Sequence, residues 1–362
     1  MKIASISEDK TLEKRVAITP EIAKKYISSG FEVILSKDYG EHLGFKNQQY
    51  ETLGVKLLNN DKEIIVNSDV ILQLRLPLDD KLSFLKENQT LIGVLDTHQN
   101  KDKILDLTKK KINNFSLELL PRITRAQSMD ILSSQANLAG YKAVVDSFSY
   151  FEKAIPMMMT AAGTVPAAKV LIVGAGVAGL QAIATAKRMG AIVFATDVRM
   201  ASKEQVESLG GKFLTVEGAE NLETEGGYAK ETSDDFKKKQ EDLLSETLKK
   251  IDIVICTALI PGKKAPIIIK ETMIQNMQAG SVIYDLAAIQ GGNTSYTEVD
   301  KVIEKNGVKI IGEKNILNKL PISASNLYAK NMFNFVINLY DKENKKININ
   351  LEDEIIEKTL IK

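Results

Sequence analysis

The chain has no tryptophan, one cysteine and two histidines among its 362 residues. Cys256 has no partner for a disulfide within the chain, and it lies in an apolar run typical of a buried strand. His42 and His98 show no metal-ligand spacing, so we expect no metal site. A single cysteine fits a protein that works in the reducing cytoplasm.

An excess of charge of one sign is also missing. The formal net charge is +1, so no overall field favours nucleic acid or an acidic membrane surface. Between Lys153 and Lys187 only Lys169 is charged. A membrane span needs about 20 apolar residues in one helix, whereas prolines and glycines interrupt this stretch. It therefore predicts buried sheet and helix in a soluble domain.

The most informative stretch begins with the apolar run 169–173, which is rich in branched residues and predicts a buried parallel strand. Gly174, Gly176 and Gly179 then form G-x-G-x-x-G. The first glycine allows a tight turn, the second lets the backbone approach a pyrophosphate, and the third lets a helix pack closely. The N-terminus of that helix, near Val177, would present free amides to the phosphate.

An acidic residue completes this pattern. Asp197 ends the next predicted strand, about 20 residues further on. A carboxylate there accepts hydrogen bonds from a ribose 2′-hydroxyl and repels a 2′-phosphate, so the predicted ligand is NAD(H) rather than NADP(H). Arg199 is interpreted as secondary. A glycine-rich packing site without a ligand is the weaker alternative, because strand, helix, second strand and acid all accompany the glycines.

The length predicts two domains. The N-terminal third alternates short strands with polar helical stretches, which predicts a second α/β layer without a dinucleotide fingerprint. A helix starting near residue 133 connects it to the NAD-binding domain, 133–318, and the C-terminal segments return to the first domain, 1–132 plus 319–362. We expect an α/β fold with two Rossmann-like open parallel-sheet domains, the first discontinuous, and a ligand in the cleft between them. The predicted helices include one that begins at Pro20, with Thr19 as N-cap and Gly30 after its end, and one over 325–340. The predicted strands are 2–7, 31–36, 69–76, 90–96, 114–120, 212–216, 252–259, 281–287, 308–312 and 346–350.

The stretch 217–240 interrupts this rhythm. It has few apolar residues, a central Gly226-Gly227-Tyr228, an acidic first part and a basic end, and it is long for a connection in an α/β domain. Composition favours a solvated surface insertion. The alternative is a mobile lid, in which the glycines supply flexibility and Tyr228 supplies an aromatic face and a hydroxyl for a nucleotide.

A second cluster of polar residues lies at 122–134 and includes Arg122, Gln127, Asp130 and Ser133. One helical turn would place Gln127 and Asp130 on one face, and Asp130 and Ser133 repeat that spacing. Such a cluster at a domain junction can hold a carboxamide and ribose hydroxyls. A polar helix start that caps itself explains the same residues equally well.

Several motifs together resemble a known family: RITRAQSMD, SSQANLAGY, PMMMTAAGTVPAAKVLIVGAGVAGLQAIATAKRMGA, ATDVR, KEQVESLGGKF, GGYAKE and TALIPGK. Over almost the whole chain they are similar to the NAD(H)-binding alpha subunit, or domain I, of proton-translocating nicotinamide nucleotide transhydrogenases. The resemblance implies that Arg122, Gln127, Asp130 and Ser133 lie near the nicotinamide and that Tyr228 is the tyrosine of a mobile loop. It implies further nucleotide contacts at Val177, Ala178, Gly179, Asp197, Val198, Arg199, Gly227, Gln240 and Leu259.

The same resemblance implies the reaction. Hydride passes from NADH on this subunit to NADP⁺ on a separate NADP(H)-binding subunit, and a membrane-spanning subunit couples the exchange to proton movement. A homodimer is implied, cytoplasmic and attached to the inner membrane through its partners. The chain contains one dinucleotide fingerprint, so a second nucleotide would have to come from a partner. We expect Arg122 and Ser133 to orient the carboxamide, Asp130 and Gln127 to position the ribose and the partner's nucleotide, and Tyr228 to close over the site.

Two other functions fit parts of the sequence. The segment KRVAITP resembles alanine dehydrogenases and puts Arg15 at their substrate position, but the lysine and histidine that oxidative deamination needs fall at Gln73 and Asp96. Ile289 replaces the acid before Q-G-G, and only His98 could rescue this interpretation. Arg15 then becomes a structural residue at an interdomain face. An NAD-sensing protein would keep the glycine fingerprint but would not need the 122–134 cluster.

Overall fold

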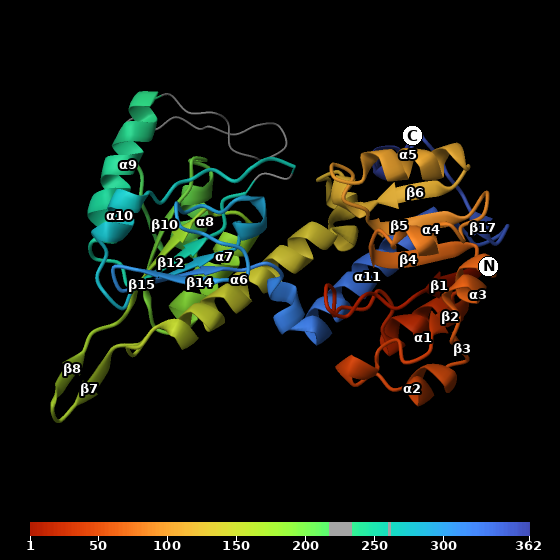
Figure 1. Ribbon diagram of the computed structural model, residues 1–362, viewed down its shortest axis with the longest axis horizontal. Helices are drawn as coiled ribbons and strands as arrows, with labels where there is room; N and C mark the ends of the chain where they lie inside the picture. Colours follow the sequence, from red (N-terminus) through yellow and green to blue (C-terminus); the bar gives the residue numbers. More distant parts are fainter. Residues whose placement is uncertain (217–233, 260–261) are drawn as a thin grey trace. The chain divides into compact units, whose positions relative to one another are not determined.

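The computed structural model describes residues 1–216, 234–259 and 262–362, without the side chains of 234–237. The chain forms two compact units, one of residues 1–135 and 320–362, the other of residues 136–319. Each is built on its own seven-stranded, mostly parallel sheet with helices packed against it (Figure 1). The predicted fold class, α/β with two Rossmann-like parallel sheets, is confirmed.

In the first unit the strand order is β18-β6-β5-β4-β1-β2-β3. From β1 the sheet extends through β2 and β3 on one side and through β4, β5 and β6 on the other. Only β18, from the end of the chain, runs antiparallel to its neighbour. The strands are β1 (Lys2–Ser5), β2 (Glu32–Ser36), β3 (Lys56–Leu58), β4 (Val70–Arg75), β5 (Thr90–Val94), β6 (Asn113–Ser116) and β18 (Leu360–Ile361). The predicted strand 114–120 is too long: its second half forms the 3-10 turn η2 (Leu117–Leu119), which brings the Glu118 carboxylate to the amides of Leu95 and Thr97.

The helices of this unit bury one face each on the sheet. α1 begins at Pro20 as predicted and Gly30 follows its end with a φ of +89°, but the Thr19 side chain makes no capping hydrogen bond to it. α11 begins at Pro321, four residues before the predicted start, and its Phe335 packs edge-on against Phe115 of β6. The predicted strand 346–350 is reduced to two residues of a small hairpin. The remaining bounds are η1 (Glu41–Leu43), α1 (Pro20–Ser28), α2 (Asn47–Glu51), α3 (Asp61–Val66), α4 (Asp79–Leu82), α5 (Lys101–Lys109), η3 (Thr124–Met129), α11 (Pro321–Leu339), β16 (Tyr340–Asp341), β17 (Lys346–Ile347) and α12 (Glu354–Thr359).

In the second unit the strand order is β11-β10-β9-β12-β13-β15-β14, and only β14 is antiparallel to its neighbour. Along β9, Val170 and Ile172 enter one hydrophobic core while Leu171 and Val173 enter another. Both faces of the sheet are therefore covered, which is why the strand is a continuous apolar run. The strands are β9 (Lys169–Val173), β10 (Ile192–Thr196), β11 (Lys212–Phe213), β12 (Ile253–Cys256), β13 (Val282–Asp285), β14 (Val302–Lys305) and β15 (Val308–Gly312).

The helices of this unit follow its strands in the usual alternation. The long helix α6 begins in the first unit and ends in the second. The bounds are α6 (Ile131–Tyr150), α7 (Val177–Arg188), α8 (Ser202–Ser208), α9 (Asp234–Leu248), α10 (Glu271–Gln275), η4 (Ala288–Gln290) and η5 (Ile316–Lys319).

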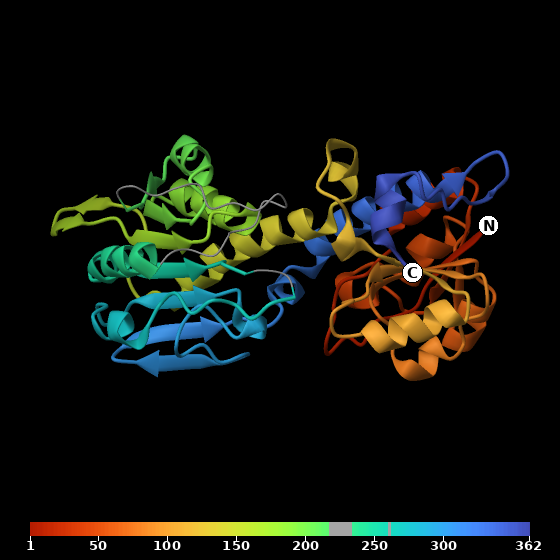
Figure 2. The same ribbon diagram turned by 90° about the horizontal axis from the view of Figure 1, so that it is seen from above.

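The weakly charged stretch after Lys153 differs from its prediction. Residues 157–165 do not form buried sheet but an antiparallel hairpin of β7 (Met158–Thr160) and β8 (Gly163–Val165), which projects away from the sheet of the second unit (Figures 1 and 2). Its Met159 is 82% exposed. Apolar composition indicated burial, but a two-stranded hairpin has no second layer that could cover it.

No helix within the described residues combines the length and apolar character needed to cross a membrane.

Candidate functional site

The glycine turn lies at the carboxyl end of β9. Gly174 has a φ of +94°, which favours glycine. A Cβ added to Gly179 would lie 1.9 Å from the carbonyl oxygen of Gly174, so the helix packs directly on the turn. At Gly176, by contrast, the nearest atom to an added Cβ is the Arg199 guanidinium, 4.0 Å away. The turn is therefore tightly packed at Gly179 and open at Gly176, as the close approach of a pyrophosphate requires.

The start of α7 follows this turn. Val177, Ala178 and Gly179 precede the first helical hydrogen bond, from the Leu180 amide to the Gly176 carbonyl at 2.8 Å. Their amides form the positive end of the helix dipole, which attracts anions.

A backbone contact from α6 holds the start of α7 in place. A Cβ on Gly140 would lie only 2.0 Å from the carbonyl oxygen of Ala178. Three residues earlier on α6, the Asn137 amide donates to Gln181 Oε1 at 3.2 Å. The position of the candidate phosphate-binding helix thus depends on a small residue in its neighbour.

Asp197 is held by four hydrogen bonds. Its carboxylate accepts from the Ala175 amide at 2.7 Å, and from the amide, Nε and Nη2 of Arg199 at 2.8, 2.9 and 2.8 Å. Burial would raise the pKa of Asp197, but the Arg199 hydrogen bonds and charge outweigh it and hold this pKa below its usual range. Arg199 is thus directly paired with Asp197, a link that the sequence interpretation did not make.

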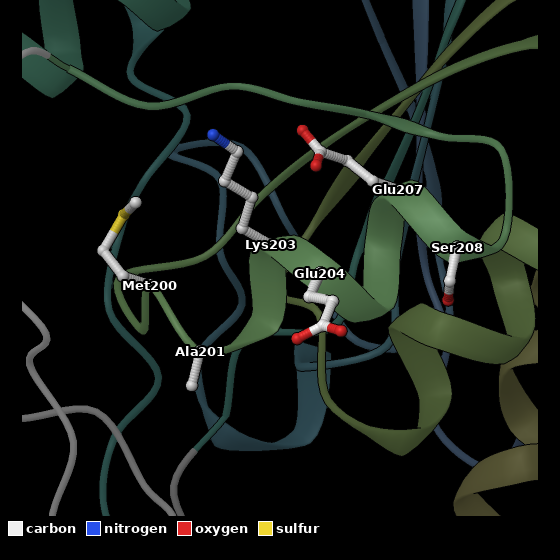
Figure 3. Close-up of a pocket in the computed structure, with 6 residues that line it drawn as sticks. All are labelled: Met200, Ala201, Lys203, Glu204, Glu207 and Ser208. Atoms are coloured by element: carbon white, nitrogen blue, oxygen red, sulfur yellow. The ribbon is translucent and has the colours of Figure 1, made fainter.

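A hollow of about 470 Å³ lies along α8 (Figure 3). None of the predicted site residues lines it. Its lining comes from one short helix and the two residues before it: Met200, Ala201, Lys203, Glu204, Glu207 and Ser208.

The loop after β12 is tied to the glycine turn. The Thr257 hydroxyl donates to the Gly174 carbonyl at 2.9 Å. The buried Asn293 side chain accepts from the Ala258 amide at 3.1 Å and donates to the Ala258 carbonyl at 2.7 Å. Leu259 follows and is exposed. Sequence reasoning missed Thr257 and Asn293, although their position after strand ends could have indicated them.

Asp285, at the end of β13, supports this loop through hydrogen bonds. It is buried and accepts from the Asn293 amide at 2.6 Å and from the Thr297 hydroxyl at 2.6 Å. Burial raises the pKa of Asp285, although these hydrogen bonds oppose the rise. This acid too was missed.

The second cluster takes the self-capping arrangement. Asp130 accepts from the Ser133 amide at 2.8 Å through Oδ1 and from the Ser133 hydroxyl at 2.6 Å through Oδ2, so it caps the start of α6. Gln127 lies in η3 instead. Asp130 directly follows η3 and its amide donates to the Gln127 carbonyl at 3.3 Å, and their shared face stays a prediction. Gln127 and Arg122 are exposed.

The predicted site residues thus lie in two groups, carried by different units. Gln240, in α9, is half-buried. Gly227 and Tyr228, with the proposed lid, lie outside the described residues. The second unit carries Gly174, Gly176, Val177, Ala178, Gly179, Asp197, Val198, Arg199 and Leu259, and the first carries Arg122, Gln127, Asp130 and Ser133.

Two residues of the alanine dehydrogenase alternative, Arg15 and Gln73, are engaged in internal contacts. Arg15 donates from Nε and Nη2 to the buried Glu13 at 2.8 and 2.7 Å, and from Nη1 to Gln135 at 2.8 Å. Gln73 is buried, and its amide bonds to the backbone of Ile6 and to Glu8. An amide with these partners provides neither the cation nor the proton transfer that deamination needs.

Across 1–216, 234–259 and 262–362, no three histidine, cysteine or acidic side chains are placed to hold a metal ion.

Comparison with known proteins gives the family. Residues 5–139 match the alanine dehydrogenase/PNT N-terminal domain and residues 143–362 the alanine dehydrogenase/PNT C-terminal domain. The chain is 48% identical over its whole length to an NAD(P) transhydrogenase alpha subunit of Rhodospirillum rubrum, covering 96% of that protein. It is 28% identical to alanine dehydrogenase of Methanococcus maripaludis, over 83% of this chain and 75% of that one.

A solved structure agrees. The transhydrogenase from Sinorhizobium meliloti superimposes with a TM-score of 0.89 at 43% identity, covering 99% of this chain and 98% of that one. The chain belongs to the alanine dehydrogenase/PNT family and, within it, groups with the alpha subunits of NAD(P) transhydrogenase.

Proposed function

We propose that this chain is the NAD(H)-binding subunit of a proton-translocating transhydrogenase. The observation that carries the proposal is the glycine turn after β9, open at Gly176 and flanked by Asp197. It supplies one dinucleotide site, and the sequence contains no second G-x-G-x-x-G. NADP(H) is then held by a partner subunit, and a membrane-spanning subunit couples the exchange to proton movement.

The residues around the turn suit NAD(H). The amides of Val177, Ala178 and Gly179 would bind the pyrophosphate. Asp197 would accept from the adenosine ribose, and its negative charge disfavours a 2′-phosphate. Contacts at Val198, Arg199, Gly227, Gln240 and Leu259 would complete the site.

The reaction depends on the relative position of the two nicotinamides more than on proton transfer by side chains. When bound, the nicotinamides supply the reaction: a hydride leaves C4 of NADH and joins C4 of NADP⁺, so NADH is oxidised and NADP⁺ reduced. The protein must bring the two carbons to about 3–3.5 Å and keep water out.

Four residues of the first unit would do the positioning. Arg122 and Ser133 orient the carboxamide, while Gln127 and Asp130 position the ribose and the partner's nucleotide. The exposure of Arg122 and Gln127 supports this, and so does the Asp130–Ser133 pair, whose hydrogen bonds can be exchanged for a ligand's. Tyr228 closes over the site.

We infer that the two compact units correspond to an N-terminal domain, 1–132 plus 319–362, and an NAD-binding domain, 133–318. The chain works at the cytoplasmic side of the inner membrane, attached through its partner subunits.

The chain forms a homodimer in this proposal, and the β7–β8 hairpin supports it. Exposed methionines are adaptable contact residues, and an isolated two-stranded hairpin is marginally stable. Met157 and Met159 are 61% and 82% exposed. A second copy that covers them would account for both facts. Sedimentation of Met159→Asp tests this: a dimer as stable as wild type contradicts the hairpin contact.

A hydride-transfer assay tests the function. The purified chain is mixed with NADH and an NADP⁺-loaded partner subunit, and a parallel sample receives alanine and NAD⁺ without partner. Transfer only with partner supports the proposal. Alanine-dependent formation of NADH would replace it with amino-acid oxidation, and NADH-dependent partner binding without transfer would indicate a sensor.

A further inference from the structure

The segment that carries Gln127, Asp130 and Ser133 changes at Asp130 from the 3-10 helix η3 to the α-helix α6. η3 is a 3-10 helix, whose hydrogen bonds are poorer than those of an α-helix, and at its end the Asp130 amide donates to the Gln127 carbonyl over 3.3 Å. Buried Ala126 and Met129 anchor one side of the segment in the core. Its polar side has hydrogen-bond partners in a second helix.

Those partners are asparagines of α11. Asn331 Nδ2 donates to the Ser128 carbonyl at 2.8 Å, and Asn331 Oδ1 accepts from the Ser134 hydroxyl at 2.7 Å. Asn334, one turn further along α11, donates to the same Ser128 carbonyl at 2.9 Å. Asn331 is 9% exposed, and it alone of these two amides joins both ends of the segment 128–134.

We propose that Asn331 is a positioning residue for hydride transfer. It acts through the segment 128–134 and fixes where Asp130 and Ser133 present their side chains. This inference rests on the proposed function, because it assigns the segment to the nicotinamide side of the site. A displacement of about 1 Å in such a segment can slow a reaction about 100-fold.

The first variant is Asn331→Ala, which removes both bonds. We expect the rate of hydride transfer at saturating NADH to fall at least about tenfold, because the near-attack geometry is lost. The Kd for NADH should change less than about threefold, since the glycine turn of the second unit provides most of the binding contacts. Ser134→Ala removes one of the two bonds and should give a smaller loss of rate.

Two controls separate positioning from stability. Asn334→Ala removes the half-buried second donor to Ser128 and should leave the rate within about twofold, because Asn331 still joins Ser128 to Ser134. Val33→Ala makes a cavity in buried β2 of the same unit and should lower the Tm without lowering the rate of the folded enzyme.

Amide hydrogen exchange of residues 128–134 gives a readout that does not depend on activity. Faster exchange there in Asn331→Ala, but not in Val33→Ala, supports the proposal. A variant Asn331→Ala with wild-type rate and wild-type exchange in this segment overturns it. If the wild-type chain transfers no hydride to an NADP⁺-loaded partner, the proposed function fails, and the exchange data still decide whether Asn331 holds the segment.

Discussion

Arg199 and Asp197 form a closed pair, in which Nε and Nη2 of the guanidinium bind the two carboxylate oxygens at 2.9 and 2.8 Å. The pair is mostly buried, and the Ala175 amide of the glycine turn joins it. Arg199 is the residue beside the site that could attract a 2′-phosphate. It pairs instead with Asp197 and keeps ionised the carboxylate that would select NAD(H).

Asp197→Asn tests this relationship. The amide keeps the size of the side chain but loses its charge, which releases Arg199. We expect weaker NADH binding and tighter NADPH binding, so that the ratio of the two Kd values narrows about tenfold or more, equivalent to about 1.4 kcal/mol. Fluorescence titration with each nucleotide measures the ratio.

Asp252→Asn is the matched control, because Asp252 accepts from the Lys169 amide at the opposite end of β9 from the glycine turn. Its nucleotide ratio should equal that of wild type. An unchanged ratio in Asp197→Asn would show that discrimination lies elsewhere.

Asp130 has two roles that two substitutions separate. Asp130→Ala removes the acceptor for the Ser133 amide and should cost about 1 kcal/mol of unfolding free energy, as for other lost helix caps. Asp130→Asn keeps an acceptor and should stay within about 0.5 kcal/mol of wild type. Both variants should transfer hydride at least about tenfold more slowly if the charge positions a nucleotide. Urea unfolding and the hydride-transfer assay give the two values, and full activity in Asp130→Asn would reduce the residue to a cap.

Gly140→Ala should damage the nucleotide site from a distance. The new methyl group would lie 2.0 Å from the Ala178 carbonyl oxygen, a backbone atom that can move away only with α7. We expect a loss of about 1–3 kcal/mol in stability together with weaker NADH binding. The exposed Ser149→Ala on the same helix removes only a local hydrogen bond to the Asp146 carbonyl, adds no atom against α7, and should retain both stability and NADH binding. Chemical unfolding measures the stability of the two variants, and titration with NADH measures their affinity. Equal values for Gly140→Ala and Ser149→Ala would contradict this prediction.

Glu8 should make stability fall as pH rises. Burial raises its pKa from 4.5 to about 7, with a contribution from Glu13, against the hydrogen bond from the Leu74 amide. Between these pH values the folded state holds a proton that the unfolded state has released. Stability is therefore greatest at or below pH 4.5 and declines up to pH 7, by about 1–3 kcal/mol for this group.

Glu8→Gln should remove that decline, measured by thermal unfolding at pH 5 and pH 8. Asp9→Asn is the control. The Thr11 hydrogen bonds lower the pKa of Asp9, so its titration changes stability only below the pH range in which Glu8 titrates. A wild-type slope in Glu8→Gln would place the titrating group elsewhere.

Local sequence signals predicted the elements whose own residues impose them. The run 169–173 is apolar on both faces, Gly174 requires a positive φ, and Gly179 has no room for a side chain, so strand, turn and helix could be expected without further context. The same holds for the acid at position 197.

Elements that depend on neighbours were less predictable. The methionines of β7 are as apolar as a core strand, but no layer of the described chain covers Met159. The boundary between η3 and α6 lies beside Ala126 and Met129, which share a hydrophobic core with residues of α11. Such packing partners are distant in sequence, and periodicity does not record them.

The sequence by itself determined the glycine turn, the acid at its tip and the alternation of strands and helices, because backbone sterics and side-chain periodicity act over a few residues. Tertiary structure alone decided which distant groups meet: Gly140 under Ala178, and Asn331 between Ser128 and Ser134. The physical reason is that close packing and buried hydrogen bonds are satisfied between elements rather than within them.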